Sequence, residues 1–411
     1  MTETDTLPSP THEHRRHHRR DIRFTARSGF WIISSAFLIE MAFCAVPTPL
    51  YAIYQRRDGY PTLVVTVIFA AYAFGVMLSL HLAGHLSDRF GRRRMVFLSL
   101  IVNLASVIVF LFWNDVAGLI VARAASGIAI GLLTATATAY LAELGTRTGR
   151  RPLVSTVIAT FTNLGGIALG PLAAGIIATV SAHPLVWSYI PFGALFLIGL
   201  ILVPRVPETA KISTPHVPYR PQRIRVPSTS RGVYFAAAAA AFGGFAVFGT
   251  FSGLSSTFLV GILHLHSALM AGVAPFIVFI SASLAQTLTV HMGQRQQLAL
   301  AIIAAVAGLG ALALSAAGGS LVLFLLGGGL AGAGVGVLFR AALSAVGRIA
   351  DDAHRGEALA GIFLIAYVGM TIPPLLTAIA LLFWSPMAVL TVLSAAIAVL
   401  VAIAGSRMLR S

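Results

Sequence analysis

Long apolar segments separated by short polar links constrain the fold of this chain more than any other feature. A bilayer core of about 30 Å takes about 20 apolar residues in one helix, and segments of that length recur through the 411 residues. Only 10% of the residues are charged, against about 25% in soluble domains. Because the backbone must satisfy its own hydrogen bonds in lipid, and because the segments do not alternate in polarity, we predict membrane-spanning helices.

We predict twelve such helices and therefore an all-α polytopic membrane protein. Their expected ranges are 30–54, 62–83, 95–113, 116–142, 152–181, 185–203, 232–261, 268–290, 298–316, 319–346, 357–382 and 386–405. The longest polar segment, 204–231, contains six prolines, which exclude a continuous helix there. We therefore expect an N-terminal six-helix bundle at 30–203, a cytoplasmic linker at 204–231 and a C-terminal six-helix bundle at 232–411.

The basic residues lie almost entirely on one side of this topology. Of the 28 lysines and arginines, 25 fall on the side of the two termini, Arg56 and Arg57 fall on the other, and Arg123 lies within a helix. This asymmetry predicts that both termini are cytoplasmic and that the protein resides in the plasma membrane, which in a bacterium is the inner membrane. Membrane orientation thereby explains the net charge of +15, and we expect no nucleic-acid partner.

Residues 1–29 form a basic tail that we expect to be disordered and cytoplasmic. Its four histidines could bind a metal, but a solvated tail beside anionic headgroups is the simpler interpretation. The pair His264 and His266 supplies too few ligands for a site, and the single Cys44 excludes an internal disulfide. We predict neither a metal site nor a cofactor.

A charged loop at 84–94 is the most specific motif in the sequence. It reads Gly84-x-x-x-Asp88-Arg89-x-Gly91-Arg92-Arg93. The glycines permit a tight turn, and Asp88 can accept hydrogen bonds from the N-terminus of a neighbouring helix, where the dipole favours an anion.

Weak internal repetition supports two related halves. The segment 290–296 aligns with this loop at an offset of 202 and keeps the glycine and one arginine, but not the acid. Pro171 and Pro373 are related by the same offset. A shared offset in corresponding hairpins indicates duplication of a six-helix unit.

The loop resembles the signature loop of the major facilitator superfamily between the second and third helices, and the resemblance covers about residues 30 to 405. It implies a two-bundle transporter that rocks around a central site. It also implies a role for Gly84, Asp88, Arg89, Gly91 and Arg92 in controlling the change of conformation. By resemblance, Asp88 would cap the eleventh helix across the bundle interface in only one of the two states.

Two charged residues lie deep within predicted helices. Glu40 is about 15 Å from the inner end of its helix and Arg123 about 10 Å from the outer end of its own, which leaves an axial gap of about 5 Å in a core of about 30 Å. A membrane-buried acid costs roughly 2.5–3.5 kcal/mol and therefore indicates function. We predict that Glu40 and Arg123 face each other in a shared cavity and couple transport to protons. The alternative is a static buried ion pair.

Two glycine-rich motifs extend the resemblance. The segment from Arg123 to Gly131 is similar to the fourth-helix motif of drug/proton antiporters of this superfamily, in which the arginine is linked to proton movement. The segment 165–175, with Gly166, Gly170, Pro171 and Gly175, is similar to the fifth-helix motif of its export branch, although Ala174 departs from that pattern. Glycines at a spacing of four also pack helices closely, so a structural interpretation stays open.

Further polar and aromatic residues complete the candidate site. Seven could line a substrate cavity, although ordinary packing is the alternative for each: Tyr51, Tyr72, Asn163, Phe245, Phe248, Gln286 and Tyr367. We expect Glu143 to pair with loop arginines such as Arg147, and Arg340 to extend to the cytoplasmic face. Pro373 and Pro374 are expected to break the eleventh helix.

These features predict a secondary active transporter that moves small molecules by alternating access. The favoured form is proton-coupled export of lipophilic or cationic compounds, as in drug efflux by an antiporter, because sparse buried charge suits amphiphiles better than sugars. The alternative is a proton symporter that imports a small metabolite such as an organic acid, with Arg123 on its carboxylate. We expect a monomer. An enzyme is disfavoured because the sequence offers no paired intramembrane acids, no metal-ligand cluster and no activated nucleophile. ATP-driven transport is also disfavoured, because the sequence contains no Walker motif.

Overall fold

The computed structural model describes residues 24–83, 90–210, 230–351 and 354–410. Within these ranges twelve helices are long and apolar enough to cross a membrane, which confirms the predicted number. The elements are α1 Ala26–Ala45, α2 Pro47–Asp58, α3 Thr62–Ala83, α5 Arg92–Phe112, α6 Val116–Arg147, α7 Pro152–Thr160, η1 Phe161–Gly165, α8 Gly166–Val180, α9 Pro184–Trp187, α10 Ile190–Leu202, η2 Val203–Arg205, α11 Arg231–Leu263, α12 Ala268–Leu288, α13 Gln294–Gly318, α14 Leu321–Ile349, α15 Arg355–Ala380 and α16 Pro386–Arg410.

Three of the twelve spans consist of more than one element. The first contains α1 and α2, which meet at Val46, directly before a proline. The fifth contains α7, the π-helical turn η1 and α8. The sixth contains α9, α10 and η2. Proline lacks the backbone N–H that would continue the helix ladder, which explains the joint at Val46.

The least polar predicted link, between the ninth and tenth spans, is a true helix boundary. Gly319 ends α13 in the left-handed region at φ 62°, and the Ser320 side chain accepts a hydrogen bond from the Leu323 N–H at 3.4 Å to cap α14. Both are ordinary helix-end signals. They end one helix and start the next although the link between the two helices has little polarity.

The eleventh span does not break at its two prolines, and that prediction was wrong. Helix α15 runs through Pro373 and Pro374. The Met370 carbonyl, which Pro374 cannot bond, packs against Gly249 of α11. Membrane helices tolerate proline where hydroxyls and neighbouring helices accommodate the altered backbone.

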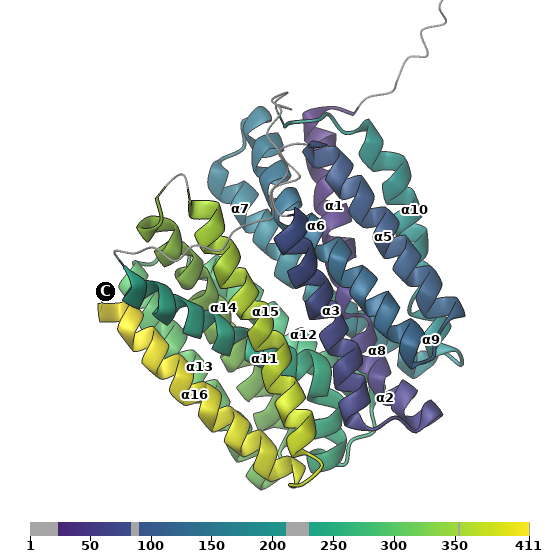
Figure 1. Cartoon of the computed structure of the whole chain (residues 1–411), viewed down its shortest axis with the longest axis vertical. Helices are drawn as coiled ribbons and strands as arrows, with labels where there is room; N and C mark the ends of the chain where they lie inside the picture. Colours follow the sequence, from purple (N-terminus) through teal and green to yellow (C-terminus); the bar gives the residue numbers. More distant parts are fainter. Residues whose placement is uncertain (1–23, 84–89, 211–229, 352–353, 411) are drawn as a thin grey trace, which may run out of the picture.

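Two buried apolar clusters underlie the arrangement seen in Figure 1, in which α1 to α10 gather on one side and α11 to α16 on the other. One cluster consists almost entirely of residues 30–206 and the other of residues 234–408. The two groups, called here the first and second bundles, touch along α8 with α12 and along α3 with α15.

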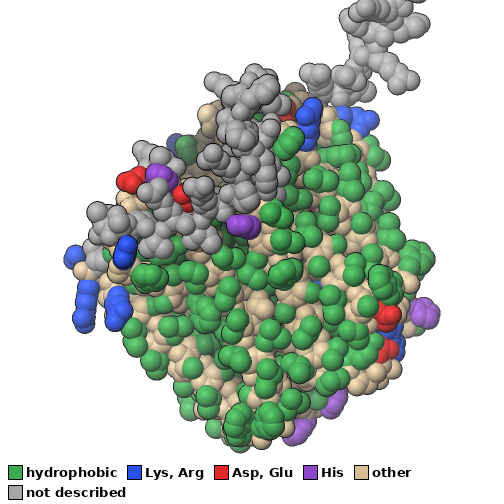
Figure 2. All heavy atoms as spheres, viewed as in Figure 1, with side chains coloured by type: hydrophobic (Ala, Val, Ile, Leu, Met, Phe, Trp, Pro, Cys, Tyr) green, Lys and Arg blue, Asp and Glu red, His purple; other side chains and the backbone are tan. Residues whose placement is uncertain are grey.

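The outer surface is that of a multi-pass membrane protein. Figure 2 shows hydrophobic side chains covering the middle of the visible face, while charged side chains gather toward its ends. We call the end that carries Arg92, Arg147, Arg205, Arg348 and Arg407 the arginine-rich end, and the end that carries Arg56 and Arg57 the opposite end.

Candidate functional site

A cavity of about 380 Å³ lies between the two bundles. Its walls come from α1, α3, α6 and the α7–α8 span of the first bundle, and from α11, α12, α14 and α15 of the second. It extends from Tyr72 and Arg123 to Ala142, Ser155 and Leu343, and therefore reaches toward the arginine-rich end. A second cavity of about 380 Å³, with no lining residue in common, lies near the opposite end beside Gln55 and His266.

Six of the seven predicted cavity residues line the cavity between the bundles. These are Tyr72, Asn163, Phe245, Phe248, Gln286 and Tyr367. The seventh, Tyr51, is only 3% exposed and packs in the apolar cluster of the first bundle. Its hydroxyl has no hydrogen-bond partner among the described residues, so Tyr51 belongs to the core of that bundle.

The wall supplied by the second bundle is largely aromatic. The Phe245 ring lies 4.8 Å from Phe339 and 5.4 Å from Tyr367, measured between centroids, and Phe248 stacks on Phe279 at 4.8 Å. Such surfaces suit a flat apolar ligand. Sequence reasoning missed Phe279 and Phe339, because an aromatic residue in an apolar helix does not reveal whether it faces lipid, core or cavity.

Glu40 is sealed inside the first bundle, away from the cavity. It is fully buried on α1, where one carboxyl oxygen accepts from the Ser99 hydroxyl at 3.0 Å and the other from the Asn103 amide at 2.8 Å. Both partners are on α5. No basic side chain of the described residues lies within 4.0 Å of it to form an ion pair.

Arg123 lies at the cavity and is held by a carbonyl and a ring. One guanidinium nitrogen donates to the Cys44 carbonyl at 2.5 Å, and the group lies 4.4 Å from the Tyr72 ring centroid. The attraction between a cation and an aromatic face favours this position. The Nε–H of Arg123 has no hydrogen-bond partner in the described part of the chain.

The predicted pairing of Glu40 with Arg123 is therefore not formed in this conformation. Their depths agree with the estimate, since Arg123 binds Cys44, one helical turn from Glu40 along α1. Depth does not fix direction around the helix axis, however. Glu40 faces α5, whereas Arg123 faces the cavity.

The partners of Glu40 were missed, although the sequence contained a signal for them. Ser99, Asn103 and Ser106 follow one another at spacings of four and three within an apolar helix. That spacing places polar groups on one helix face. All three are buried, so a polar stripe on a lipid-buried helix would have indicated a partner such as Glu40.

The fifth-span motif packs α8 between α1 and α12. A Cβ atom on Gly170 would lie 1.9 Å from the Ala42 carbonyl oxygen, and one on Gly166 would lie 2.8 Å from that of Leu38, both on α1. Gly175 faces Ala268 of α12, and Gly272 of α12 would bring a Cβ within 2.3 Å of the Pro171 carbonyl oxygen. The motif thus brings both bundles into close backbone contact.

The candidate gating loop is only partly described: Gly84, Asp88 and Arg89 lie outside the described residues. Its second glycine, Gly91, adopts φ 97°, and a Cβ there would lie 2.6 Å from a Glu208 carboxyl oxygen. Only glycine fits both conditions without strain. Gly91 therefore lets the carboxylate of Glu208 reach the first turn of α5.

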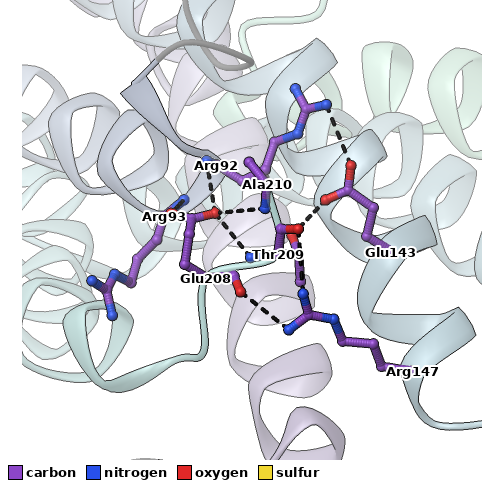
Figure 3. A network of polar contacts seen from close by, with 7 residues as sticks. All are labelled: Arg92, Arg93, Glu143, Arg147, Glu208, Thr209 and Ala210. Atoms are coloured by element: carbon purple, nitrogen blue, oxygen red, sulfur yellow. Dashed lines mark hydrogen bonds and ion pairs between the residues drawn. The ribbon is translucent and has the colours of Figure 1, made fainter. Parts of the chain in front are cut away.

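Glu208 anchors the N-terminus of α5 (Figure 3). Its carboxylate accepts the backbone N–H of Arg92 at 3.0 Å and of Arg93 at 3.1 Å, together with the N–H groups of Thr209 and Ala210. An anion at this position satisfies unpaired helix donors and complements the helix dipole.

Glu143 pairs with a loop arginine as predicted, but the arginine is Arg92 (Figure 3). Glu143 pairs with Arg92 at 3.3 Å and accepts from the Thr209 hydroxyl. Arg147, the arginine given as an example, donates instead to the carbonyls of Glu208 at 3.1 Å and Thr209 at 3.3 Å. The segment after η2 lies between the two side chains and supplies partners to both.

Replacing Glu208 with alanine should lower the stability of the protein by about 1–3 kcal/mol, because partly buried N–H groups of α5 lose their acceptor. Glu208→Gln retains one acceptor oxygen, but its NH2 group cannot accept from the Arg93 N–H that the second carboxyl oxygen binds. It should cost less than alanine, about 0.5–1.5 kcal/mol for the lost hydrogen bond and charge. Thermal unfolding of the purified protein measures both. Equal loss in the two variants would contradict this account of the carboxylate.

Arg340 reaches toward the arginine-rich end, as expected, but protein groups at the α12–α13 turn bind its guanidinium there. It donates to the Gln286 carbonyl, to the Thr289 hydroxyl at 3.3 Å and to the Gln297 side-chain oxygen at 2.9 Å. It is half-buried and lines the cavity. Close packing of α14 on α12 at Gly336 and Ala282 brings these groups within reach.

Comparison of the sequence with known proteins identifies the family and relatives that the chain resembles. A family model described as Major Facilitator Superfamily matches residues 24–329. Sugar efflux transporter A of Dickeya chrysanthemi is 29% identical over 191 residues, 46% of this chain and 44% of that protein. Multidrug resistance protein 2 of Bacillus subtilis (strain 168) is 30% identical over 111 residues, 27% of each chain. The chain therefore matches less than half the length of these relatives.

Solved transporter structures share the fold over nearly the whole chain. The human organic anion transporter MFSD10 has a TM-score of 0.67 at 17% identity, with 94% of this chain and 100% of that chain covered. The nucleoside transporter NupG has a TM-score of 0.72 at 12% identity, with 93% of this chain and 100% of that chain covered. The peptide transporter POT has a TM-score of 0.74 at 17% identity, with 92% of this chain and 94% of that chain covered. At these identities the likeness is one of fold alone.

Proposed function

We propose that this chain, which belongs to the Major Facilitator Superfamily, is a proton-coupled exporter of small, largely apolar molecules. Its family and its transporter neighbours make it a membrane transporter for small molecules, and not an enzyme. Export, proton coupling and the kind of molecule moved are the proposal.

The cavity between the bundles is the observation that carries the proposal. Both bundles contribute to its walls, so a relative movement of the bundles would change access to it. It extends toward the arginine-rich end, while α8 and α12 hold the bundles together nearer the opposite end. Because basic residues favour the cytoplasmic side, we place the arginine-rich end and both termini there, in the plasma membrane. The cavity is then presented to the side from which an exporter loads.

Glu40 supplies the proton site in this scheme. A carboxyl group that is fully buried and lacks a cation is most stable as the neutral acid. A movement of α1 against α6 that brought Arg123 to Glu40 would favour the carboxylate and release the proton. Glu40 and Arg123 are thus proposed to couple protonation to conformation through alternate partners.

Two further observations support export of apolar molecules. Efflux and multidrug resistance are the printed functions of the two curated relatives described above, and the fifth-span motif is similar to that of exporters. The aromatic cavity wall offers few hydrogen-bonding groups for a sugar. The cavity is formed within one chain, so we propose that the monomer is the functional unit.

Everted membrane vesicles that contain the full chain test this function. Lipophilic fluorescent compounds that are neutral, cationic or permanently anionic would be added under an imposed pH gradient, acid inside. We expect accumulation of at least one compound, and its loss when an uncoupler collapses the gradient. Accumulation that survives the uncoupler, or transport only into right-side-out vesicles, would contradict proton-coupled export.

A further inference from the structure

We propose that the molecule accepted by this cavity is an amphipathic organic anion, whose charged group binds Arg340 and whose apolar body lies against the neighbouring phenylalanines. This inference rests on the proposed function, because it takes the cavity as the transport site. It narrows the substrate class and replaces the cationic compounds that the sequence suggested.

The cavity wall carries a net positive charge. Two arginines, Arg123 and Arg340, line the cavity, and no aspartate or glutamate of the described residues does. Those acids lie elsewhere: Glu40 faces α5, Asp58 and Asp115 are at the opposite end, and Glu143, Glu208, Asp351 and Glu357 are at the arginine-rich end. In a site of low dielectric, two uncompensated positive charges attract an anion and repel a cation.

Arg340 is the arginine able to bind a ligand directly. A guanidinium has five N–H donors, and the three hydrogen bonds of Arg340 go to a carbonyl, a hydroxyl and an amide oxygen. These acceptors are neutral, so the positive charge has no counterion among the described residues. The half-buried side chain is fixed in direction by these bonds, and it retains donors for an incoming oxyanion.

The surroundings of Arg340 hold it in place without an ion pair. The Gln297 amide donates to the carbonyls of Thr289 and Met292, both at 2.7 Å, while its oxygen accepts from Arg340. The Gln286 amide donates to the Gly336 carbonyl at 2.8 Å. The turn between α12 and α13 is thus joined to α14 by side chains that orient the guanidinium. Such pre-organisation reduces the cost of binding.

Arg123 contributes charge to the cavity and is not the direct contact. It is only 2% exposed, donates to the Cys44 carbonyl and lies against Tyr72. A ligand would have to displace these contacts to reach it. Its field still favours an anion in the cavity.

The apolar body of the ligand has an adjacent surface. Phe339 precedes Arg340 in α14, and its ring lies 4.8 Å from Phe245 and 5.6 Å from Phe363. All three rings line the cavity. A flat aromatic body with one anionic group therefore matches both parts of this wall, the rings and the guanidinium.

Binding to the purified full-length protein in neutral detergent tests the proposal. Three probes of similar shape would be compared by calorimetry: naphthalene-2-sulfonate, the neutral naphthalene-2-sulfonamide and the permanently cationic trimethyl-2-naphthylammonium. We expect the sulfonate to bind about tenfold or more tightly than either of the others, as a charge-assisted hydrogen bond gives. Equal affinities, an absence of binding by all three, or tighter binding of the cation would overturn the proposal.

Variants assign the effect to Arg340. Arg340→Gln should reduce sulfonate affinity about tenfold while the sulfonamide affinity changes little, and Arg340→Lys should retain much of the preference because it retains the charge. The control is Arg348→Gln, since Arg348 is exposed and bonds only Ser344 among the described residues. An unchanged probe ratio in Arg340→Gln, or equal loss of all three probes, would refute the role of Arg340.

This experiment separates the two proposals. It uses no membrane and no pH gradient, so anion-selective binding can be found even where proton-coupled export fails in vesicles. Conversely, proton-driven export of cationic compounds by a protein without anion preference would refute the substrate class and leave the proposed function intact.

Discussion

Gly170→Ala is expected to destabilise the protein by about 1–3 kcal/mol, the usual cost of adding volume to a close-packed site. A Cβ at this position would lie 1.9 Å from the Ala42 carbonyl oxygen. That obstacle is backbone, so a side-chain rotation cannot relieve it, and α8 would have to move away from α1. Because α8 also contacts α12 through Gly175, the displacement should reach the bundle interface and lower transport as well.

The chain provides its own reporter and control for this prediction. Cys44 is the single cysteine of the sequence and is buried on α1, so a fluorogenic thiol reagent would signal unfolding of the first bundle. Gly310 lies inside α13 with nothing within 4 Å of its would-be Cβ. Gly310→Ala should therefore leave the melting temperature unchanged or slightly raised. Equal melting temperatures in the two alanine variants would contradict the packing account of the motif.

Glu40→Gln is expected to abolish uphill, gradient-driven accumulation while exchange of substrate across the membrane continues. The amide has the shape of the carboxyl group and can still accept from Ser99. It can also donate to the Asn103 side-chain oxygen, which has no partner among the described residues. The fold should therefore be preserved, and only the proton is lost. Accumulation under a pH gradient and gradient-free counterflow would be measured in parallel.

Asp58→Asn serves as the matched control for this substitution. Asp58 pairs with the neighbouring Arg57 at 2.7 Å at the opposite end of the molecule, where a surface ion pair contributes only about 0–1 kcal/mol. Accumulation should persist in this variant. If both variants accumulate substrate as the unaltered protein does, Glu40 is not the proton site.

The fold was largely predictable because membrane insertion follows simple one-dimensional rules. Span length and the placement of arginines gave twelve helices, and Gly319 with Ser320 marked even the weakest boundary. The error at Pro373 and Pro374 arose from a three-dimensional cause. Gly249 of α11 accommodates the Met370 carbonyl that Pro374 leaves unbonded, and this glycine is distant from the prolines in sequence.

The site was less predictable because depth along a helix does not give direction around it. Glu40 and Arg123 lie at nearby depths, yet one faces α5 and the other the cavity. The partners of Arg340 were not predictable for a related reason. A long basic side chain near a helix end can extend to water, but Gln286 and Gln297 bind this one beside the cavity. Such partners come from helix packing, which composition does not determine.

Proton movement driven by substrate tests the central claim most directly. Purified full-length protein would be reconstituted in potassium-loaded liposomes with valinomycin and an internal pH dye, and the compound most strongly accumulated by the everted vesicles would be added outside. We predict internal alkalinisation as substrate enters in exchange for protons, and none with Glu40→Gln, although labelled substrate still exchanges. Substrate entry without a pH change, internal acidification, or an equal response in Glu40→Gln would contradict proton-coupled export through Glu40.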